Sequence, residues 1–180
     1  MRKVILYIAM SLDGFIADEE GKVDWLLGED ADYPGDYGYE AFARNVDTVI
    51  MGRKTYGQIV TELSPDTWVY RGKKTYVLTH EEREDKEEIC FFSGRVSELV
   101  ETLKKELGRD IWICGGREVV RELMEEDLID EYQLSVMPVI LGGGIRLFSG
   151  GHSSMRLHVK ESRAENGVVC LTYVRKRPQG

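Results

Sequence analysis

The sequence predicts one α/β domain over residues 1–180, with a mixed and mostly parallel sheet between two layers of helices. In the first two-thirds of the chain, apolar runs typical of strands alternate with helical stripes, which is the pattern of βαβ units. Beyond Asp130 the helical stripes stop and strand-like segments follow one another directly. These segments are residues 132–141, 155–164 and 168–176. Because Asn166-Gly167 is a strong hairpin signal, we expect antiparallel strands at the edge of the sheet.

The expected elements follow in order along the chain. Residues 4–10 form a continuous apolar run, which indicates a first strand buried on both faces. Residues 11–38 are irregular and rich in Gly, Asp and Glu, and a loop of this length is usually functional or mobile. Further strands are expected at 48–51, 75–79, 89–92 and 111–114. Helices are expected at 39–45, at 55–63, at 96–107 before a stop at Gly108, and around 119–124.

The bulk composition excludes several classes of protein. Hydrophobic residues make up 42% of the 180 residues and charged residues 31%, which suits one globular domain with a sizeable core. The net charge of -8 gives no general attraction to nucleic acid or to an anionic membrane. Three cysteines without a C-x-x-C pair favour a reducing compartment, and the apolar run at 4–9 is too short for a signal peptide or a membrane span. We therefore expect a cytoplasmic protein with no nucleic-acid or membrane partner.

Three expected strand ends share glycine and basic residues. They read Met51-Gly52-Arg53-Lys54-Thr55, Leu78-Thr79-His80 and Cys114-Gly115-Gly116-Arg117. In parallel α/β sheets ligands bind beyond the carboxyl ends of the strands, so these segments are expected to converge. Arg53, Lys54 and Arg117 stand where helices should begin, and positive charge is unfavourable there unless an anion is bound between them.

The glycines support the same interpretation. Gly115 and Gly116 carry no Cβ, so they let a pyrophosphate reach the main chain. Two alternatives stay open, a plain tight turn at these glycines and a solvated surface pair at Arg53-Lys54. Neither G-x-G-x-x-G nor G-x-x-x-x-G-K-[ST] is present, so neither the Rossmann fingerprint nor a P-loop accounts for the pattern. Together the strand ends predict a phosphate-binding site.

The loop after the first strand carries candidate groups for a flat ligand. Asp13-Gly14 is either a turn or a carboxylate beside a ligand, and Trp25 is either a core side chain or a stacking surface. A carboxylate next to an aromatic wall suits a heterocycle with ring N–H groups. The histidines have no H-E-x-x-H spacing, and the zinc-deaminase signature and the G-x-S-x-G elbow are absent. We expect no metal site.

In this order, these stretches resemble the dihydrofolate reductase-like superfamily, and most of all its branch that includes the reductase domain of bacterial riboflavin biosynthesis. The matching stretches are Ser11-Leu12-Asp13-Gly14, Met51-Gly52-Arg53-Lys54-Thr55-Tyr56, Cys114-Gly115-Gly116, and Leu128-Ile129-Asp130-Glu131 leading to Pro138-Val139-Ile140-Leu141-Gly142-Gly143. They cover nearly the whole chain, and we expect a stand-alone reductase domain without a deaminase domain. The resemblance implies a three-layer αβα fold with NADPH laid across the strand ends.

The resemblance also implies roles for individual residues. It implies contacts with NADPH from Ala9, Ile16, Gly52, Arg53, Lys54, Thr55, Leu78, Thr79, His80, Cys114, Gly115, Gly116, Arg117, Glu118 and Val119. It implies contacts with the substrate from Tyr7, Asp13, Trp25, Phe42 and Tyr56. Ala9 and Ile16 would border the nicotinamide, and Asp13 or a bound water would assist proton transfer. Because a 2′-phosphate needs cations, Arg53 and Lys54 favour NADPH over NADH.

Two positions depart from the riboflavin-pathway reductases. Tyr7 stands where those proteins usually carry Lys, and Cys114 stands where they usually carry an acidic residue. Both changes remove polar groups expected to handle an aminouracil or its ribityl phosphate.

Three hypotheses follow from the whole sequence. The first is NADPH-dependent reduction of a small pterin-like or aminopyrimidine ring, similar to the reactions of 5-amino-6-(5-phosphoribosylamino)uracil reductase and dihydrofolate reductase. The second is a non-catalytic NADP(H)-binding protein or sensor on the same fold. The third is a structural protein in which Arg53, Lys54 and Arg117 are unrelated surface charges. An exposed sheet edge also favours a homodimer.

Overall fold

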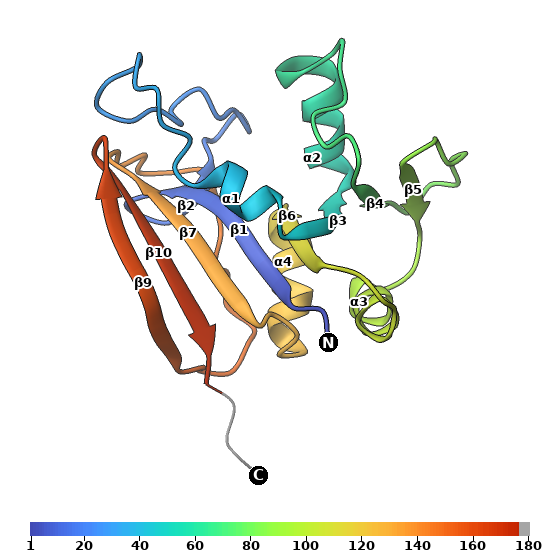
Figure 1. The fold of residues 1–180 in the computed structure, drawn as a ribbon. Helices are drawn as coiled ribbons and strands as arrows, with labels where there is room; N and C mark the ends of the chain where they lie inside the picture. The colour runs from blue at the N-terminus through green and yellow to red at the C-terminus, as the bar shows by residue number, and fades with distance from the viewer. Residues whose placement is uncertain (177–180) are drawn as a thin grey trace.

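The computed structural model describes residues 1–176, and its centre is an eight-stranded sheet in the order β5-β4-β3-β6-β1-β7-β10-β9 (Figure 1). Its strands are β1 (Val4–Ser11), β3 (Val46–Gly52), β4 (Lys74–Leu78), β5 (Ile89–Phe92), β6 (Asp110–Gly115), β7 (Glu131–Met137), β9 (Leu157–Glu165) and β10 (Val168–Arg175). The helices are α1 (Tyr39–Ala43), α2 (Arg53–Gln58), the π-helical turn η1 (Ile59–Leu63), α3 (Val96–Lys105) and α4 (Arg117–Glu125). Two short strands, β2 (Phe15–Ala17) and β8 (Ile145–Arg146), form a separate antiparallel ribbon.

Strand pairing explains the mixed character of the sheet. β1 lies between β6 and β7 and runs parallel to both, and β3, β4 and β5 continue the parallel side. On the other side β10 pairs antiparallel with β7, and β9 pairs antiparallel with β10. The predicted mostly parallel sheet with antiparallel C-terminal strands is confirmed. One detail differs, because β7 follows α4 and returns parallel to β1 as the second strand of a βαβ unit.

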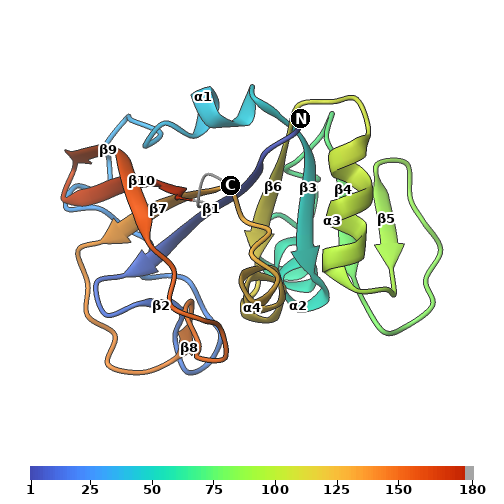
Figure 2. The ribbon, with the colours of Figure 1, turned by 90° about the horizontal axis from the view of Figure 1, so that it is seen from below.

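Helices cover both faces of the sheet. α3 and α4 pack on one face, where their apolar stripes meet fully buried strand residues such as Leu6 and Ile113. On the other face α1 and α2 contribute Phe42 and Tyr56 to a second core that includes Val49. Figure 2 shows α1 on one side of the strands and α4 on the other. The predicted αβα layering is therefore present, although the α1 side covers only part of its face.

The short elements and boundaries are where the sequence predictions differ from the structure. The predicted loop 11–38 contains β2, and β8 was not predicted, because strands of two or three residues carry no periodic signal. The helix expected at 55–63 begins at Arg53 and widens into η1 before it ends at Leu63. β7 stops at Met137 rather than 141, since Pro138 has no N–H to continue the ladder.

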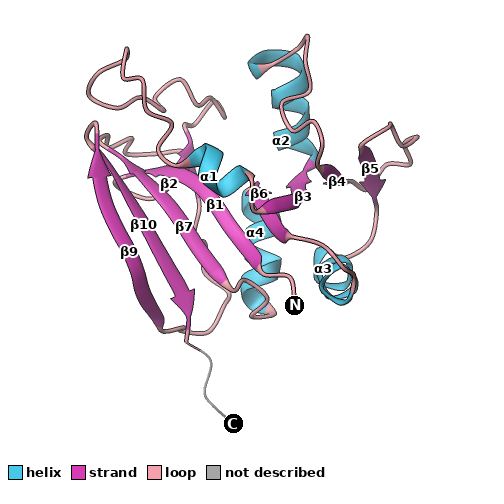
Figure 3. Cartoon of the chain, viewed as in Figure 1, coloured by secondary structure: helices cyan, strands magenta, loops and turns pink. Residues whose placement is uncertain are grey.

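The loops that carry the candidate residues gather at one end of the sheet (Figure 3). The loop after β1 and the segment of α2 after β3 both extend beyond the carboxyl ends of the strands. Within residues 1–176, no helix has the length and the apolar character needed to cross a membrane. The same residues contain no group of three His, Cys, Asp or Glu side chains arranged to hold a metal.

Candidate active site

The ends of β3 and β6 meet at two glycine turns. Gly52 ends β3, and Gly116 directly precedes α4. A Cβ on Gly52 would lie 3.7 Å from the main-chain nitrogen of Gly116, and a Cβ on Gly116 would lie 3.4 Å from Thr55 Oγ1. Gly115 has a φ of +128°, which residues with a side chain rarely adopt, and its peptide bond to Gly116 is cis. The two turns therefore approach each other with no side chain between them, as expected for strand ends that converge.

Basic side chains border the glycine turns, but two of them already have acidic partners. Arg53 Nη1 lies 3.4 Å from Glu81 Oε1, and Arg117 Nη2 lies 2.9 Å from Glu118 Oε1. Lys54 is exposed and makes no ion pair with any residue of the described chain. The positive charge that the sequence placed here is thus partly neutralised by carboxylates of the same chain.

The other residues predicted to contact the cofactor lie around the same strand ends. Leu78 ends β4, and the buried Thr79 accepts the Glu81 N–H with its hydroxyl at 3.1 Å. Val119 is buried in the first turn of α4, whereas His80 is exposed. The remaining members of this set are Ala9 on β1, Ile16 on β2 and Thr55 on α2.

Asp13 lies just after β1, where several hydrogen bonds hold its carboxylate. Its carboxylate accepts the Ser11 hydroxyl at 2.6 Å and the main-chain N–H groups of Leu141 and Gly142 at 3.1 and 2.8 Å. These hydrogen bonds, first that from Ser11, lower the pKa of Asp13 to about 2. Asp13 is therefore a carboxylate at neutral pH, and its assistance to proton transfer stays a prediction. The same carboxylate ties the end of β1 to the loop after β7.

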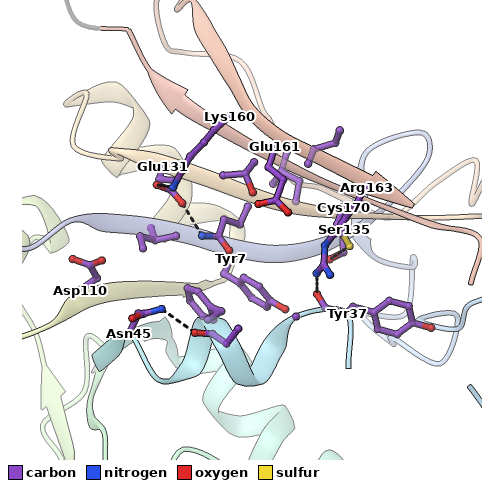
Figure 4. Close-up of a pocket in the computed structure, with 18 of the residues that line it drawn as sticks. Tyr7, Tyr37, Asn45, Asp110, Glu131, Ser135, Lys160, Glu161, Arg163 and Cys170 are labelled. Atoms are coloured by element: carbon purple, nitrogen blue, oxygen red, sulfur yellow. Dashed lines mark hydrogen bonds and ion pairs between the residues drawn. The ribbon is translucent and has the colours of Figure 1, made fainter. Parts of the chain in front are cut away.

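A cavity of about 510 Å³ lies between α1 and the sheet face formed by β1, β7, β9 and β10 (Figure 4). We call it the α1 cavity. Two of the predicted substrate residues, Tyr7 and Phe42, line it, and their rings are stacked with centroids 4.1 Å apart. Trp112 packs edge-on against both rings and donates its indole N–H to the Tyr7 carbonyl. Trp112 therefore holds the Tyr7 and Phe42 rings in place, and these two rings form a flat wall of the cavity.

The Tyr7 phenol keeps its proton over the whole physiological range. Burial, together with the nearby Cys170, raises the pKa of Tyr7 to about 12. A neutral phenol is a hydrogen-bond donor as well as an acceptor. The residue that replaces the usual lysine of this position therefore offers an O–H group without a charge.

The other predicted substrate residues lie away from the α1 cavity. Tyr56 is 5% exposed and packs in the core against Trp68 and Phe91, while its hydroxyl accepts Lys86 Nζ at 3.1 Å. Trp25 is half-buried in the loop after β2, outside both core clusters, and donates its indole N–H to the Lys22 carbonyl. Trp25 thus lies outside the core, and its stacking on a ligand ring stays a prediction, as does the substrate contact of the buried Tyr56.

Several residues that line the cavity were missed by the sequence reasoning. Gln133 and Ser135 project from β7, and Arg163 and Cys170 come from the C-terminal hairpin. The alternation of β7 puts residues 131, 133 and 135 on one face, so periodicity alone was a usable signal for this strand. No local signal linked the hairpin residues to α1.

The cavity carries charge of both signs. Its cationic side chains are Lys3, Lys160 and Arg163, and its anionic side chains are Asp110, Glu131 and Glu161. Glu131 is 3% exposed and accepts Lys160 Nζ at 3.3 Å and Gln133 Nε2 at 2.7 Å. The equal numbers of cations and anions leave no excess positive charge to bind a phosphate tail.

Cys114 occupies the position where an acidic residue was expected, and its thiol is not ionised. Burial raises the pKa of the Cys114 thiol to about 11, and the Tyr70 hydroxyl lies 3.5 Å from its sulfur. Cys90 and Cys170 are also free thiols. The site therefore has no carboxylate at the end of β6.

The long loop that reaches α1 is held by the turn between β9 and β10. Asn166 Oδ1 accepts the Asp30 N–H at 2.8 Å, and its Nδ2 donates to the Asp30 carbonyl at 2.9 Å and to the Tyr37 hydroxyl at 2.8 Å. Tyr33 donates to Glu165, and Arg163 donates to the Tyr37 carbonyl. The hairpin predicted from Asn166-Gly167 thus also positions residues 28–38, which form one wall of the cavity with Tyr37 and Gly38.

Comparison with known proteins gives one consistent family. The sequence model of the RibD C-terminal domain matches residues 2–171. YwjB of Bacillus subtilis (strain 168) is 42% identical over 175 residues, covering 97% of this chain and 98% of that protein. YyaP of the same organism is 34% identical over 182 residues, covering 96% and 94%. Both relatives are described as uncharacterized proteins.

Solved structures share the fold. A Shewanella sp. PV-4 protein, provisionally assigned to riboflavin biosynthesis, has a TM-score of 0.85 at 32% identity, with 97% and 99% of the two chains covered. The Thermotoga maritima diaminohydroxyphosphoribosylaminopyrimidine deaminase/5-amino-6-(5-phosphoribosylamino)uracil reductase has a TM-score of 0.71 at 16% identity, and the match covers 97% of this chain and 57% of that chain.

The fold, with its glycine turns at the strand ends, defines a dihydrofolate reductase-like α/β protein. Because the family model and the relatives span nearly the whole chain, the protein belongs to the RibD C-terminal domain family. This family is the reductase domain of RibD, which supports an oxidoreductase at that level of description.

Proposed function

We propose that the protein is an NADPH-dependent reductase of a small pterin-like or aminopyrimidine ring. The observation that carries this proposal is the position of the glycine turns and the α1 cavity beside the same strand. A Cβ on Gly115 would lie 3.4 Å from Ile8 Cδ1, and Ile8 stands on β1 between Tyr7 and Ala9. Ala9 pairs with Ser135, which lines the cavity. The glycine turns and the cavity thus both border β1, with Ile8 on the α3 and α4 side of the sheet and Tyr7 on the α1 side.

The residues at the turns fit a dinucleotide phosphate. Because Gly52 and Gly116 have no Cβ, a ligand can approach their main-chain atoms. α4 has nine residues, and the N–H groups of its first turn have no acceptors within the helix. Lys54 adds a cation at the same end of the sheet. NADPH bound there would supply the hydride.

The α1 cavity fits the substrate ring. The stacked Tyr7 and Phe42 rings offer a flat apolar wall, while Gln133 and Ser135 offer amide and hydroxyl groups for ring nitrogens. The balanced charge of the cavity favours a substrate without a phosphate over a phosphoribosyl compound. Tyr7 donates a hydrogen bond from its neutral hydroxyl and orients the ring or the water that delivers the proton. Asp13 acts as a positioning residue through the loop at 141–142.

The direct test is NADPH binding to a variant that fills the glycine site. Gly52→Ala fits the folded chain, since its Cβ would make ordinary contacts of 3.7 Å with Gly116 N and Val119 Cγ2. We expect NADPH affinity to fall about tenfold, the size of one lost hydrogen bond of about 1.4 kcal/mol. Gly57→Ala is the matched control, because a Cβ there meets nothing within 4 Å. Equal affinity in wild type and Gly52→Ala would refute a phosphate at these turns.

A non-catalytic dinucleotide-binding protein is the second candidate, and Cys114 is the observation that favours it. Its protonated thiol replaces the acidic group that riboflavin-pathway reductases usually carry before the two glycines. This candidate predicts NADPH binding without turnover. A spectrophotometric screen of NADPH oxidation against pterins, quinonoid pterins and aminouracils separates the two candidates.

We further propose a homodimer formed through the edge strand β9. β9 lies at the end of the sheet order, and its first eight residues are exposed. Unpaired edge strands are surfaces for association between chains. Light scattering coupled to size exclusion would test this, and a monomer at micromolar concentration would exclude it.

A further inference from the structure

Glu81 bridges two arginines at the dinucleotide end of the sheet. Its Oε1 lies 3.4 Å from Arg53 Nη1, and its Oε2 accepts Arg83 Nη2 at 3.0 Å and Nε at 3.3 Å. The three side chains are between 39% and 55% exposed, so the bridge stands at the surface where a ligand can reach it. Both guanidinium groups are held by one carboxylate.

The bridge lies beside the glycine turn of β3. Gly52 pairs with Leu78 in the parallel register of β3 and β4, so Arg53 and the segment after Leu78 leave neighbouring strands side by side. The Glu81 main chain is fixed by its N–H bond to the Thr79 hydroxyl. Arg83 is held over the Phe91 ring, with its guanidinium carbon 5.8 Å from the ring centroid. The Glu81 carboxylate therefore stands on a segment whose main chain and neighbouring Arg83 are held in place.

We propose that Glu81 sets the dinucleotide preference of this protein by competing with the 2′-phosphate for Arg53 and Arg83. This inference rests on the proposed function, together with the resemblance that implies a contact between Arg53 and the 2′-phosphate. A 2′-phosphate needs the same guanidinium N–H groups that the carboxylate now occupies. The 2′-hydroxyl of NADH, in contrast, is a donor that a carboxylate accepts. Glu81 thus narrows the preference for NADPH over NADH without reversing it.

The surroundings of Glu81 strengthen this competition at neutral pH. The hydrogen bond from Arg83, and then the charge of Arg53, hold the pKa of Glu81 below its usual range, so the carboxylate stays ionised. Glu82 and Glu84 line the same cavity of about 450 Å³ as Glu81 and Arg83. A phosphate here would meet negative charge from three carboxylates. The cations at Arg53 and Lys54 therefore do not by themselves select NADPH, as their position in the sequence suggested.

The test compares two charge-matched variants of the full chain. Glu81→Gln removes the bridging charge, and Glu84→Gln removes the same charge from the same cavity at a residue without an ion pair to the described chain. Dissociation constants for NADPH and NADH are measured by calorimetry for wild type and both variants. We expect Glu81→Gln to bind NADPH roughly two- to fivefold more tightly, the range for exchange of exposed ion pairs. NADH affinity should fall, and Glu84→Gln should keep the wild-type ratio.

The outcomes separate this inference from the function on which it rests. An unchanged NADPH-to-NADH ratio in Glu81→Gln would overturn the role of Glu81 while leaving the reductase proposal intact. An equal shift in Glu84→Gln would also overturn it, because the effect would then be the general potential of the acidic segment. Wild-type protein that binds neither dinucleotide would overturn the proposed function, and this inference with it.

Discussion

Replacement of Asn166 by glycine should release residues 28–38 without unfolding the sheet. Asn166 has a φ of +50°, which glycine adopts without strain, so the hairpin between β9 and β10 keeps its turn. The substitution removes three side-chain hydrogen bonds, two to Asp30 and one to Tyr37. The main-chain bond from the Glu29 N–H to the Asn166 carbonyl remains. The hydrogen bonds from Tyr33 to Glu165 and from Arg163 to the Tyr37 carbonyl also remain, so the loop loses three hydrogen bonds to the hairpin and keeps three.

The free energy lost with these three hydrogen bonds depends on their exposure to solvent. A net hydrogen bond contributes about 0.5–1.5 kcal/mol, and the two bonds to Asp30 are solvent-exposed, so the three together contribute roughly 2 kcal/mol. This corresponds to about a thirtyfold larger population of the open loop. Hydrogen exchange read by mass spectrometry should show faster exchange in peptides covering 28–38 and unchanged exchange in β9 and β10.

Tyr37→Phe is the graded control for this experiment. Tyr37→Phe removes only one of the three bonds, so its peptides should exchange at rates between those of wild type and Asn166→Gly. Unchanged exchange at 28–38 in Asn166→Gly would refute the claim that this side chain holds the loop. Equal acceleration in β9 and β10 would show that the substitution damages the hairpin instead.

Three further predictions concern stability and turnover. Asp13→Asn should lower the melting temperature most above about pH 4 and least near pH 2. The reason is that a carboxyl whose pKa is lowered from 3.8 to about 2 stabilises the fold only while it is ionised. A difference in melting temperature that does not change with pH would contradict this. Arg2→Ala should cost about 2 kcal/mol in urea unfolding, since the 5%-exposed Arg2 side chain donates to Asp47 and Thr48 at 2.5 Å and to the Arg109 carbonyl at 2.6 Å, while Asp47 keeps the Thr48 hydroxyl and the Arg109 N–H as donors. Tyr7→Phe keeps the ring stack and should lower kcat about tenfold with the Kd for NADPH unchanged; loss of NADPH binding would instead place Tyr7 in the cofactor site.

The sequence predicted the elements well where the signal is local. The stripes of α3 and α4 and the strand at 89–92 agree with the structure because burial on one face imposes a period that can be read residue by residue. The glycine turns at Gly52 and Gly115-Gly116 also followed from local chemistry. Of the residues that line the α1 cavity, the resemblance named only Tyr7 and Phe42, because the other walls come from strands distant in sequence.

The type and order of the elements and the position of the glycine turns could be predicted from the chain, since periodicity and turn chemistry act over a few residues. Which charged groups meet depends instead on the packing of distant segments. This packing puts Asp13 on the N–H groups of 141–142, and it puts Glu81 between Arg53 and Arg83. Such contacts depend on the strand order, which brings together segments up to about 130 residues apart in the chain. No local pattern could identify the main-chain N–H groups that Asp13 accepts, because the strand order brings them to it.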